Sequence, residues 1–112
     1  MTLFEKIIAK ELPATILYED EQCICIKDIS PQAKVHALLI PKQVIPSLND
    51  LTQDHQNLIA HLMLQIPKIA SDLGLSEAGY RVVNNIGQYG RQSVQHLHFH
   101  ILGGEQLSGN FA

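Results

Sequence analysis

Three histidines alternate with apolar residues near the C-terminal end of the chain, and they are His96, His98 and His100. Side chains on a β-strand point alternately to opposite faces, so the three imidazoles are expected on one side of a strand. The apolar residues between them are expected on the other side, in the core. Polar rings on such a strand are costly to bury unless their nitrogens have partners. The pattern therefore indicates a site that uses imidazole nitrogens for catalysis or for metal ligation.

Two kinds of chemistry suit this cluster, and the spacing alone leaves both open. In the first, the histidines bind zinc, because His-x-His on a strand can present two imidazoles to one tetrahedral ion. His36, on another predicted strand, could then supply a further ligand. In the second, one imidazole is a nucleophile or a general acid–base and its neighbours orient it. His55 and His61 fall on a predicted helix, where we expect hydrogen-bonded structural residues.

A small mixed fold must position these histidines. Five strands are predicted, over residues 16–18, 23–27, 35–40, 80–85 and 94–102. Thr2 and Glu5 fit a capping box that begins a short helix, which should end before Pro13. A long helix is predicted to start near Thr52, because apolar residues recur every three or four positions as far as Leu73. Separate helices, and strands joined mostly by short turns, favour an α+β fold with an antiparallel sheet, one long helix and one short helix.

Two residues bear on the shape of the long helix. Pro67 lies inside the apolar pattern and removes one backbone donor, so we expect the helix to be kinked or divided there. Gly74 follows the last apolar position and is expected to form the C-terminal cap.

Length and composition exclude several classes of protein. A chain of 112 residues with 46% apolar residues suffices for a single domain, residues 1–112, and is too short for two. A net charge of −3 argues against binding polymeric nucleic acid, which requires clustered Lys and Arg. The longest apolar stretch, residues 37–40, ends at Pro41, so no membrane span is expected. Glu5 and Lys6 interrupt the apolar N-terminal residues, so no signal peptide is expected. Cys23 and Cys25 suit buried thiols in a reducing compartment, which predicts a cytoplasmic location.

Several separated segments together resemble a known family. Residues 96–102 resemble the His-φ-His-φ-His-φ-φ signature of the histidine triad (HIT) superfamily, in which φ is apolar. The glycines at 103–104, residues 28–33 and residues 36–42 resemble its Hint branch, the histidine triad nucleotide-binding proteins. The likeness runs in order and spacing from about residue 3 to residue 104. It implies a HIT-like fold and the activity of a purine nucleoside phosphoramidase that uses no cofactor.

The resemblance implies catalytic roles for the histidines. His98, the middle one, would attack the α-phosphorus of a nucleoside phosphoramidate. An amine would leave, and water would then release the nucleoside monophosphate. The other ring nitrogen of His98 is expected against a backbone carbonyl. His96 and His36 are implied to support the nucleophile and to pass protons.

The resemblance also implies residues that bind the nucleotide. His100, Asn85 and Ser93 would hold the phosphate oxygens, with Ser93 placed to meet the leaving nitrogen. Asp28 matches the acid that accepts hydrogen bonds from the ribose hydroxyls, although its local sequence also suits a turn. The apolar slot for the base would be lined by Ile29, Phe4 and Ile7.

The chain departs from the family pattern at three places. Residues 90–92 read Gly-Arg-Gln where relatives commonly have Gly-Gly-Gln. Arg91 could add a phosphate contact or point to solvent, and Gln92 is included among the nucleotide-binding residues. Gln95 stands where an aromatic residue is frequent. Residues 105–112 lack the tryptophan found in the tail of some members, which leaves the preferred leaving group open.

The expected partners are an AMP or GMP phosphoramidate as substrate and a second copy of the chain. The long helix is apolar over a wide face, and strand 80–85 would expose backbone groups if it lies at a sheet edge. Hint proteins join two such edges into a homodimer. Catalysis is expected to need no metal, because no cysteine or carboxylate stands at a familiar zinc spacing. Two alternatives remain, a nucleotide-binding protein with little turnover and a zinc-binding protein that uses His36, His96, His98 and His100.

Overall fold

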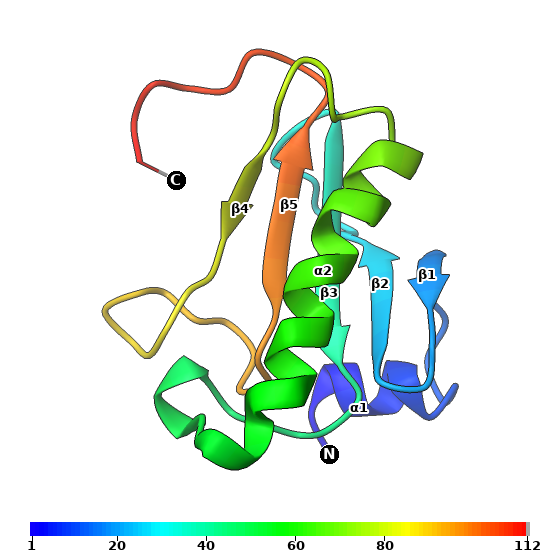
Figure 1. The fold of residues 1–112 in the computed structure, drawn as a ribbon, viewed down its shortest axis with the longest axis vertical. Helices are drawn as coiled ribbons and strands as arrows, with labels where there is room; N and C mark the ends of the chain where they lie inside the picture. The colour runs from blue at the N-terminus through cyan, green and yellow to red at the C-terminus, as the bar shows by residue number, and fades with distance from the viewer. Residues whose placement is uncertain (112) are drawn as a thin grey trace.

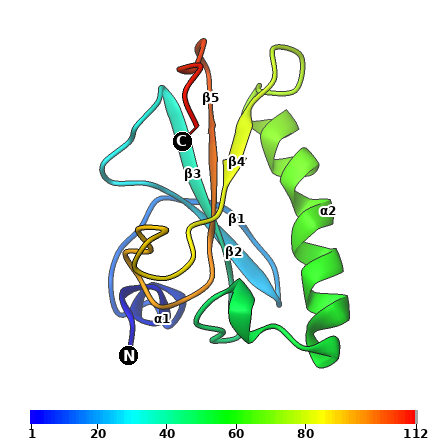
Figure 2. The same ribbon diagram turned by 90° about the vertical axis from the view of Figure 1, so that its left-hand side faces the viewer.

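An antiparallel sheet of five strands, in the order β1-β2-β3-β5-β4, forms the centre of the molecule (Figure 1). The structure, a computed structural model, describes residues 1–111. The strands are β1 (Ile16–Glu19), β2 (Cys23–Lys27), β3 (Val35–Pro41), β4 (Arg81–Val83) and β5 (Phe99–Gly103). One long helix, α2 (Gln56–Asp72), covers one face, and a short helix, α1 (Leu3–Ile8), lies on the other side (Figure 2). The predicted α+β class, with five antiparallel strands and two helices of unequal length, is confirmed.

Alternation along the strands separates the two faces of the sheet. The buried core on the α2 side includes Cys23, Cys25, Ala37, Leu39, Leu97, Phe99 and Ile101. A smaller cluster on the α1 side contains Phe4, Ile7, Ile24, Ile26, Leu38 and Ile40. Leu97, Phe99 and Ile101 therefore face α2, as the alternating pattern predicts. The imidazoles between them lie on the opposite face, which carries α1.

The capping box predicted for α1 is present. The Thr2 hydroxyl accepts the Glu5 backbone N–H at 3.1 Å, and the Glu5 carboxylate accepts the Thr2 N–H at 2.9 Å. These two bonds satisfy amides that the first turn of a helix otherwise leaves unpaired. Phe4 and Ile7 on this helix are buried against the sheet.

α2 differs from the prediction at its start, and it is not divided at its proline. It begins at Gln56 rather than near Thr52, because residues 48–50 and 53–55 form separate 3₁₀ turns. The predicted division at Pro67 does not occur, since one helix runs through it to Asp72. Pro67 is exposed, whereas Ile66 beside it is buried against the sheet. Tertiary packing of the apolar face therefore outweighs the hydrogen bond that the proline removes.

Gly74 ends α2 as predicted. Its φ of +77° lies in the left-handed region that favours glycine. The N–H of Leu75 donates to Ala70 O at 2.9 Å, and the N–H of Gly74 donates to Ser71 O at 3.0 Å. This pair of bonds is the Schellman arrangement, which satisfies the last carbonyls of the helix.

Two strands are shorter than predicted. β4 occupies only the middle of the predicted 80–85 segment, and β5 omits the first residues of the predicted 94–102 segment. Residues 94–98 are irregular, with a bend over the first three. Here the Leu97 N–H donates to the Ile45 carbonyl at 2.7 Å, in a loop rather than in a neighbouring strand. The first two histidines of the triple thus precede β5, and only the third lies within it.

The two cysteines are free thiols with no exposed surface, as predicted. Burial raises the pKa of Cys25 to about 12. Burial and then the nearby Asp20 carboxylate raise the pKa of Cys23 to about 12 as well. None of the helices within residues 1–111 has the length and apolar character that crossing a membrane requires.

Candidate active site

His36 and His100 lie on neighbouring central strands, on the face of the sheet opposite α2. The register pairs Leu38 with His100 and His36 with Leu102, so the two histidines are diagonal neighbours across β3 and β5. His36 Nε2 lies 2.9 Å from His100 Nδ1. The ring of His98 follows, with its centroid 5.2 Å from that of His100. The structure therefore places His36, the predicted fourth histidine, beside His100 and close to His98.

The ring of His98 is held by a carbonyl of its own loop. Nδ1 of His98 lies 2.7 Å from the carbonyl oxygen of His96. Because a carbonyl oxygen only accepts, the proton is on Nδ1, and Nε2 of the neutral ring has none. Regular strands direct their carbonyls toward neighbouring strands, and the irregular backbone before β5 turns this one toward the ring instead. Within residues 1–111, Nε2 of His98 makes no hydrogen bond.

His96 is fully buried, and both of its ring nitrogens have partners. Nε2 lies 2.7 Å from the carbonyl oxygen of Pro41, so this nitrogen carries the proton. Nδ1 lies 3.4 Å from the Thr2 hydroxyl, the same group that caps α1. His96 therefore connects the loop before β5 with both β3 and the start of α1.

Hydrogen bonds also determine the tautomers of His36 and His100. The backbone N–H of Gln32 donates to His36 Nδ1 at 3.0 Å, so a neutral His36 carries its proton on Nε2. That proton is donated to His100 Nδ1, which leaves the proton of His100 on its own Nε2. Oδ2 of Asp28 lies 3.4 Å from the same His36 nitrogen. The backbone amide of Gln32 thus determines which nitrogen carries the proton in both His36 and His100.

The three rings are held in their neutral forms near pH 7. Burial lowers the pKa of His36 and of His98 below the ordinary value of 6.5. Burial, and then the neighbouring imidazoles, lower the pKa of His100 to about 4. A neutral imidazole has one nitrogen with a lone pair, which is what a nucleophile needs.

A pocket of about 320 Å³ lies between α1 and the end of β2, and the ring of Phe4, which lines it, contacts the ring of His98 at a centroid distance of 4.9 Å. This volume is within the range of small-ligand sites, about 300–1,000 Å³. Asp28 stands at the pocket, where its Oδ1 accepts the Ser30 N–H at 2.8 Å, which makes the turn expected from the local sequence. The sequence-predicted residues that line this pocket are Phe4, Ile7, Asp28, Ile29 and Ser93.

A second pocket, of about 310 Å³, lies against the same histidine pair on the β4 side. Asn85 lines it together with His36 and His100. The Asn85 amide donates to the Gly90 carbonyl at 2.8 Å, so its nitrogen is engaged in the loop that follows β4. Asn85 is therefore brought to the histidines, whereas Ser93 is brought to the first pocket.

Both polar atoms of the Gln92 side chain make hydrogen bonds to the backbone around its loop. Its amide nitrogen donates to the carbonyls of Pro46 at 2.6 Å and Val94 at 3.0 Å, and its oxygen accepts the Gly87 N–H at 2.9 Å. Arg91, next to it, is exposed and has a φ of +63°, in the region that favours glycine. Gln92 is therefore engaged in hydrogen bonds of the loop, whereas Arg91 is exposed to solvent.

Residues 1–110 match the family model described as "Scavenger mRNA decapping enzyme C-term binding". An uncharacterized HIT-like protein of Synechococcus elongatus is 51% identical, over 96% of this chain and 93% of that protein. The purine nucleoside phosphoramidase of Escherichia coli K12 is 42% identical, over 95% of this chain and 89% of that protein.

The chain belongs to the HIT family. Solved structures agree with this. The HIT family hydrolase of Clostridium thermocellum superposes with a TM-score of 0.95 at 42% identity, covering 99% of this chain and 96% of that one. The HIT family hydrolase of Legionella pneumophila gives a TM-score of 0.94 at 43% identity, covering 97% of each chain. The fold of this chain is therefore that of HIT hydrolases.

One residue that supports the HIT segment, residues 96–102, was not predicted from the sequence. Asn84 Nδ2 donates to the His98 carbonyl at 2.8 Å, so it holds the backbone of the middle histidine. Its side-chain oxygen is buried and has no hydrogen-bond partner in the described part of the chain. Its neighbour Asn85 has the same side chain but donates to Gly90 instead. The sequence alone therefore does not show which of the two amides bonds to the HIT segment.

The zinc alternative is restricted by these contacts. Both nitrogens of His96 are engaged, so this residue offers no free ligand atom. The group that does converge is Asp28, His36 and His100, whose ligand atoms lie within 4.8 Å of one another.

We expect the free energy of unfolding to fall as the pH drops from about 6.5 toward 4. In this window unfolded histidines take up protons, while His100, with a pKa of about 4, stays neutral in the folded state. Because the unfolded state then binds more protons, acid favours unfolding. Urea denaturation at several pH values measures the slope, which should be shallower in His100→Gln by up to about 1.4 kcal/mol per pH unit. Equal slopes in the two proteins would contradict the burial of a neutral His100.

Proposed function

We propose that this HIT protein hydrolyses purine nucleoside phosphoramidates, splitting the P–N bond of a nucleoside 5′-monophosphate amine. The observation that carries the proposal is the His98 ring, whose Nδ1 donates to the His96 carbonyl at 2.7 Å and leaves Nε2 with a lone pair. An imidazole that burial keeps neutral attacks phosphorus without first losing a proton. The 42% identity to a purine nucleoside phosphoramidase supports this choice of substrate.

The proposed reaction has two steps at one phosphorus atom. Nε2 of His98 bonds to the α-phosphorus as the P–N bond breaks, and the amine leaves with the bonding electron pair and takes up a proton. Water then attacks the nucleotidyl-histidine, gives up a proton, and releases the nucleoside monophosphate. His100 would donate from Nε2 to a phosphate oxygen, since its Nδ1 accepts from His36. Ser93 and the N–H of Asn85 that does not donate to Gly90 are the further donors we propose, with Ser93 nearest to the leaving nitrogen.

The nucleoside is proposed to occupy the pocket beside α1. Phe4 and Ile7 are buried apolar side chains at this pocket and would pack against the base, while the exposed Ile29 would cover it. The Asp28 carboxylate would accept the ribose hydroxyls. Arg91 is proposed to approach the phosphate from the outer side of its loop.

Replacing His98 by Asn should abolish turnover and leave nucleotide binding measurable. The Asn side chain cannot form the nucleotidyl intermediate, so kcat should fall by at least about 1,000-fold. His55→Asn, in the 3₁₀ turn that precedes α2, is the matched control and should retain wild-type rates. Mixing wild type with an AMP phosphoramidate, quenching within milliseconds and mapping peptides by mass should find AMP on the peptide that contains His98. Activity of His98→Asn within tenfold of wild type would disprove the assignment.

Ribose recognition by Asp28 should make the protein prefer ribonucleotides. Losing a hydrogen bond to a charged group costs about 1.5–3 kcal/mol, so a 2′-deoxy substrate should lose roughly ten- to a hundredfold in kcat/KM. Asp28→Ala should remove most of that preference. Asp28→Asn keeps an acceptor for the Ser30 N–H of the turn and so separates a folding defect from lost recognition. Equal kcat/KM for the two sugars in wild type would take Asp28 out of the site.

We also propose that the protein is a homodimer. β4 is an edge strand of the sheet, with Val82 41% exposed, and α2 leaves Leu64 64% exposed. Unpaired edge backbone and exposed apolar side chains are features that self-association removes. Sedimentation equilibrium at micromolar concentration should give twice the chain mass of 12.5 kDa. A single species at the chain mass would refute the dimer.

A further inference from the structure

A second cluster of chemically capable side chains lies on the other face of the sheet, under α2. Asp20 and Cys23 belong to the turn between β1 and β2 and to the start of β2, and His61 comes from the middle of α2. Cys23 is fully buried in the core that α2 covers. The ring of His61 and the carboxylate of Asp20 are 26% and 24% exposed, so solvent reaches one side of the cluster.

The ligand atoms of this cluster already converge. The sulfur of Cys23, a carboxylate oxygen of Asp20 and a ring nitrogen of His61 all lie within 4.8 Å of one another. The closest pair is His61 Nε2 and Asp20 Oδ2, at 2.6 Å. The three donors are a thiol, an imidazole and a carboxylate, which is the mixture of sulfur, nitrogen and oxygen ligands that zinc accepts.

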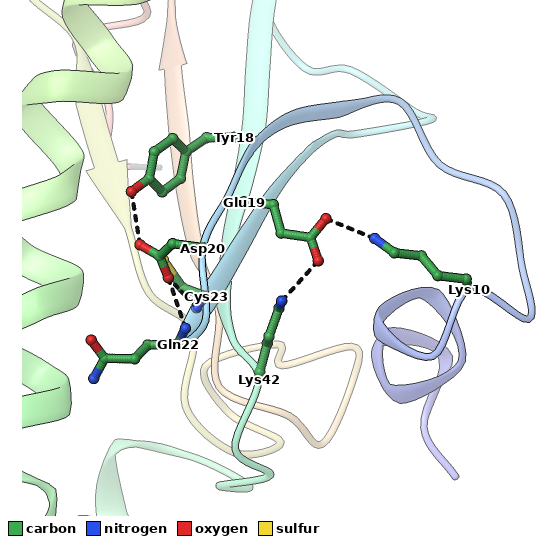
Figure 3. A network of polar contacts seen from close by, with 7 residues as sticks. All are labelled: Lys10, Tyr18, Glu19, Asp20, Gln22, Cys23 and Lys42. Atoms are coloured by element: carbon green, nitrogen blue, oxygen red, sulfur yellow. Dashed lines mark hydrogen bonds and ion pairs between the residues drawn. The ribbon is translucent and has the colours of Figure 1, made fainter.

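The Asp20 carboxylate is oriented before any ligand binds. Its Oδ1 accepts the backbone N–H groups of Gln22 at 2.8 Å and Cys23 at 2.9 Å. Its Oδ2 accepts the Tyr18 hydroxyl at 2.7 Å. Figure 3 shows Tyr18 and Asp20 pointing to the same side of the hairpin, while Glu19 points away toward Lys10 and Lys42. Such outer partners hold a metal-binding carboxylate in place.

The second nitrogen of His61 also has a neighbour. Its Nδ1 lies 3.5 Å from the side-chain amide of Gln65, one turn further along α2 and buried. If Nε2 binds a metal, the ring proton must lie on Nδ1, and the oxygen of a rotated Gln65 amide would accept it. A metal-bound histidine usually donates its other N–H in this way.

We propose that Asp20, Cys23 and His61 bind one Zn²⁺ ion, with a water molecule as the fourth ligand, and thereby join the β1–β2 hairpin to α2. Zn–O and Zn–N bonds of about 2.0 Å and a Zn–S bond of about 2.3 Å place tetrahedral ligand atoms about 3.3–3.6 Å apart. The Asp20–His61 contact would therefore open by about 0.7 Å on binding. Binding releases the thiol proton of Cys23 to solvent, and the resulting thiolate bonds to the metal.

Such a site is independent of the proposed hydrolase activity, because the sheet separates it from His98. Its expected effect is on stability, since an ion that binds only the folded chain shifts the unfolding equilibrium. Zn²⁺ should therefore raise the Tm of the wild-type protein, and removal of the ion with a chelator should leave turnover unchanged.

Co²⁺ titration tests the site, because a thiolate that ligates Co²⁺ gives a charge-transfer absorption in the near ultraviolet. Wild type should develop this band to saturation at about one Co²⁺ per chain, and Zn²⁺ should abolish it. Cys23→Ser should lose the band, and His61→Asn should weaken Co²⁺ binding at least about tenfold. Cys25→Ser, a buried cysteine on the same strand, and His55→Asn are the matched controls and should behave like wild type.

Several results would overturn the site. They are the absence of a thiolate band in wild type, loss of the band in Cys25→Ser but not in Cys23→Ser, and undiminished Co²⁺ affinity in His61→Asn. Co²⁺ binding without a thiolate band would exclude Cys23 as a ligand and would also refute the proposal. If circular dichroism shows that Cys23→Ser does not fold, the Co²⁺ affinity of His61→Asn and the thiolate band of the wild-type protein decide the question.

Discussion

The hydrogen bond from His98 Nδ1 to the carbonyl of His96, 2.7 Å long, joins the backbone geometry of the HIT segment to its chemistry. It fixes which nitrogen of the ring carries the proton, and burial keeps the ring neutral. The bond requires a carbonyl that is turned out of the strand pattern. That carbonyl belongs to the irregular residues that precede β5, outside the regular strand.

The rest of the fold holds that short loop from several directions. His96 is anchored to Pro41 on β3 and to the hydroxyl of Thr2 that caps α1. Asn84, just after β4, holds the carbonyl of His98 itself. Elements that are far apart in the sequence thus converge on three consecutive residues. The same logic orients the neighbouring pair, where a backbone amide sets the tautomer of His36 and, through it, that of His100.

The sequence predicted the features that depend on local pattern. The alternation of imidazoles and apolar residues placed Leu97 and its neighbours under α2, and Thr2 with Glu5 marked the start of α1. Features that depend on tertiary contacts were missed. Of the kink or division expected at Pro67, the division does not occur, because the packing of Ile66 and its neighbours on the sheet keeps α2 in one piece. β5 begins at Phe99 rather than at residue 94, and the Leu97 N–H before it bonds to the distant carbonyl of Ile45, a contact that no local pattern reveals.

The candidate site divides in the same way. The histidines were recognisable from their spacing, whereas the role of Asn84 was not, since Asn85 beside it is chemically identical. The contact of Asp20 with His61 joins residues 41 positions apart and left no signature in the spacing of cysteines and carboxylates.

The central claim, that backbone contacts fix the tautomer of His98, can be tested directly by long-range ¹H–¹⁵N correlation spectroscopy of the histidine rings near pH 7. The account predicts a neutral His98 with the proton on Nδ1 and a bare Nε2, beside a His100 protonated on Nε2. A His98 ring that is protonated on Nε2, or on both nitrogens, would contradict it.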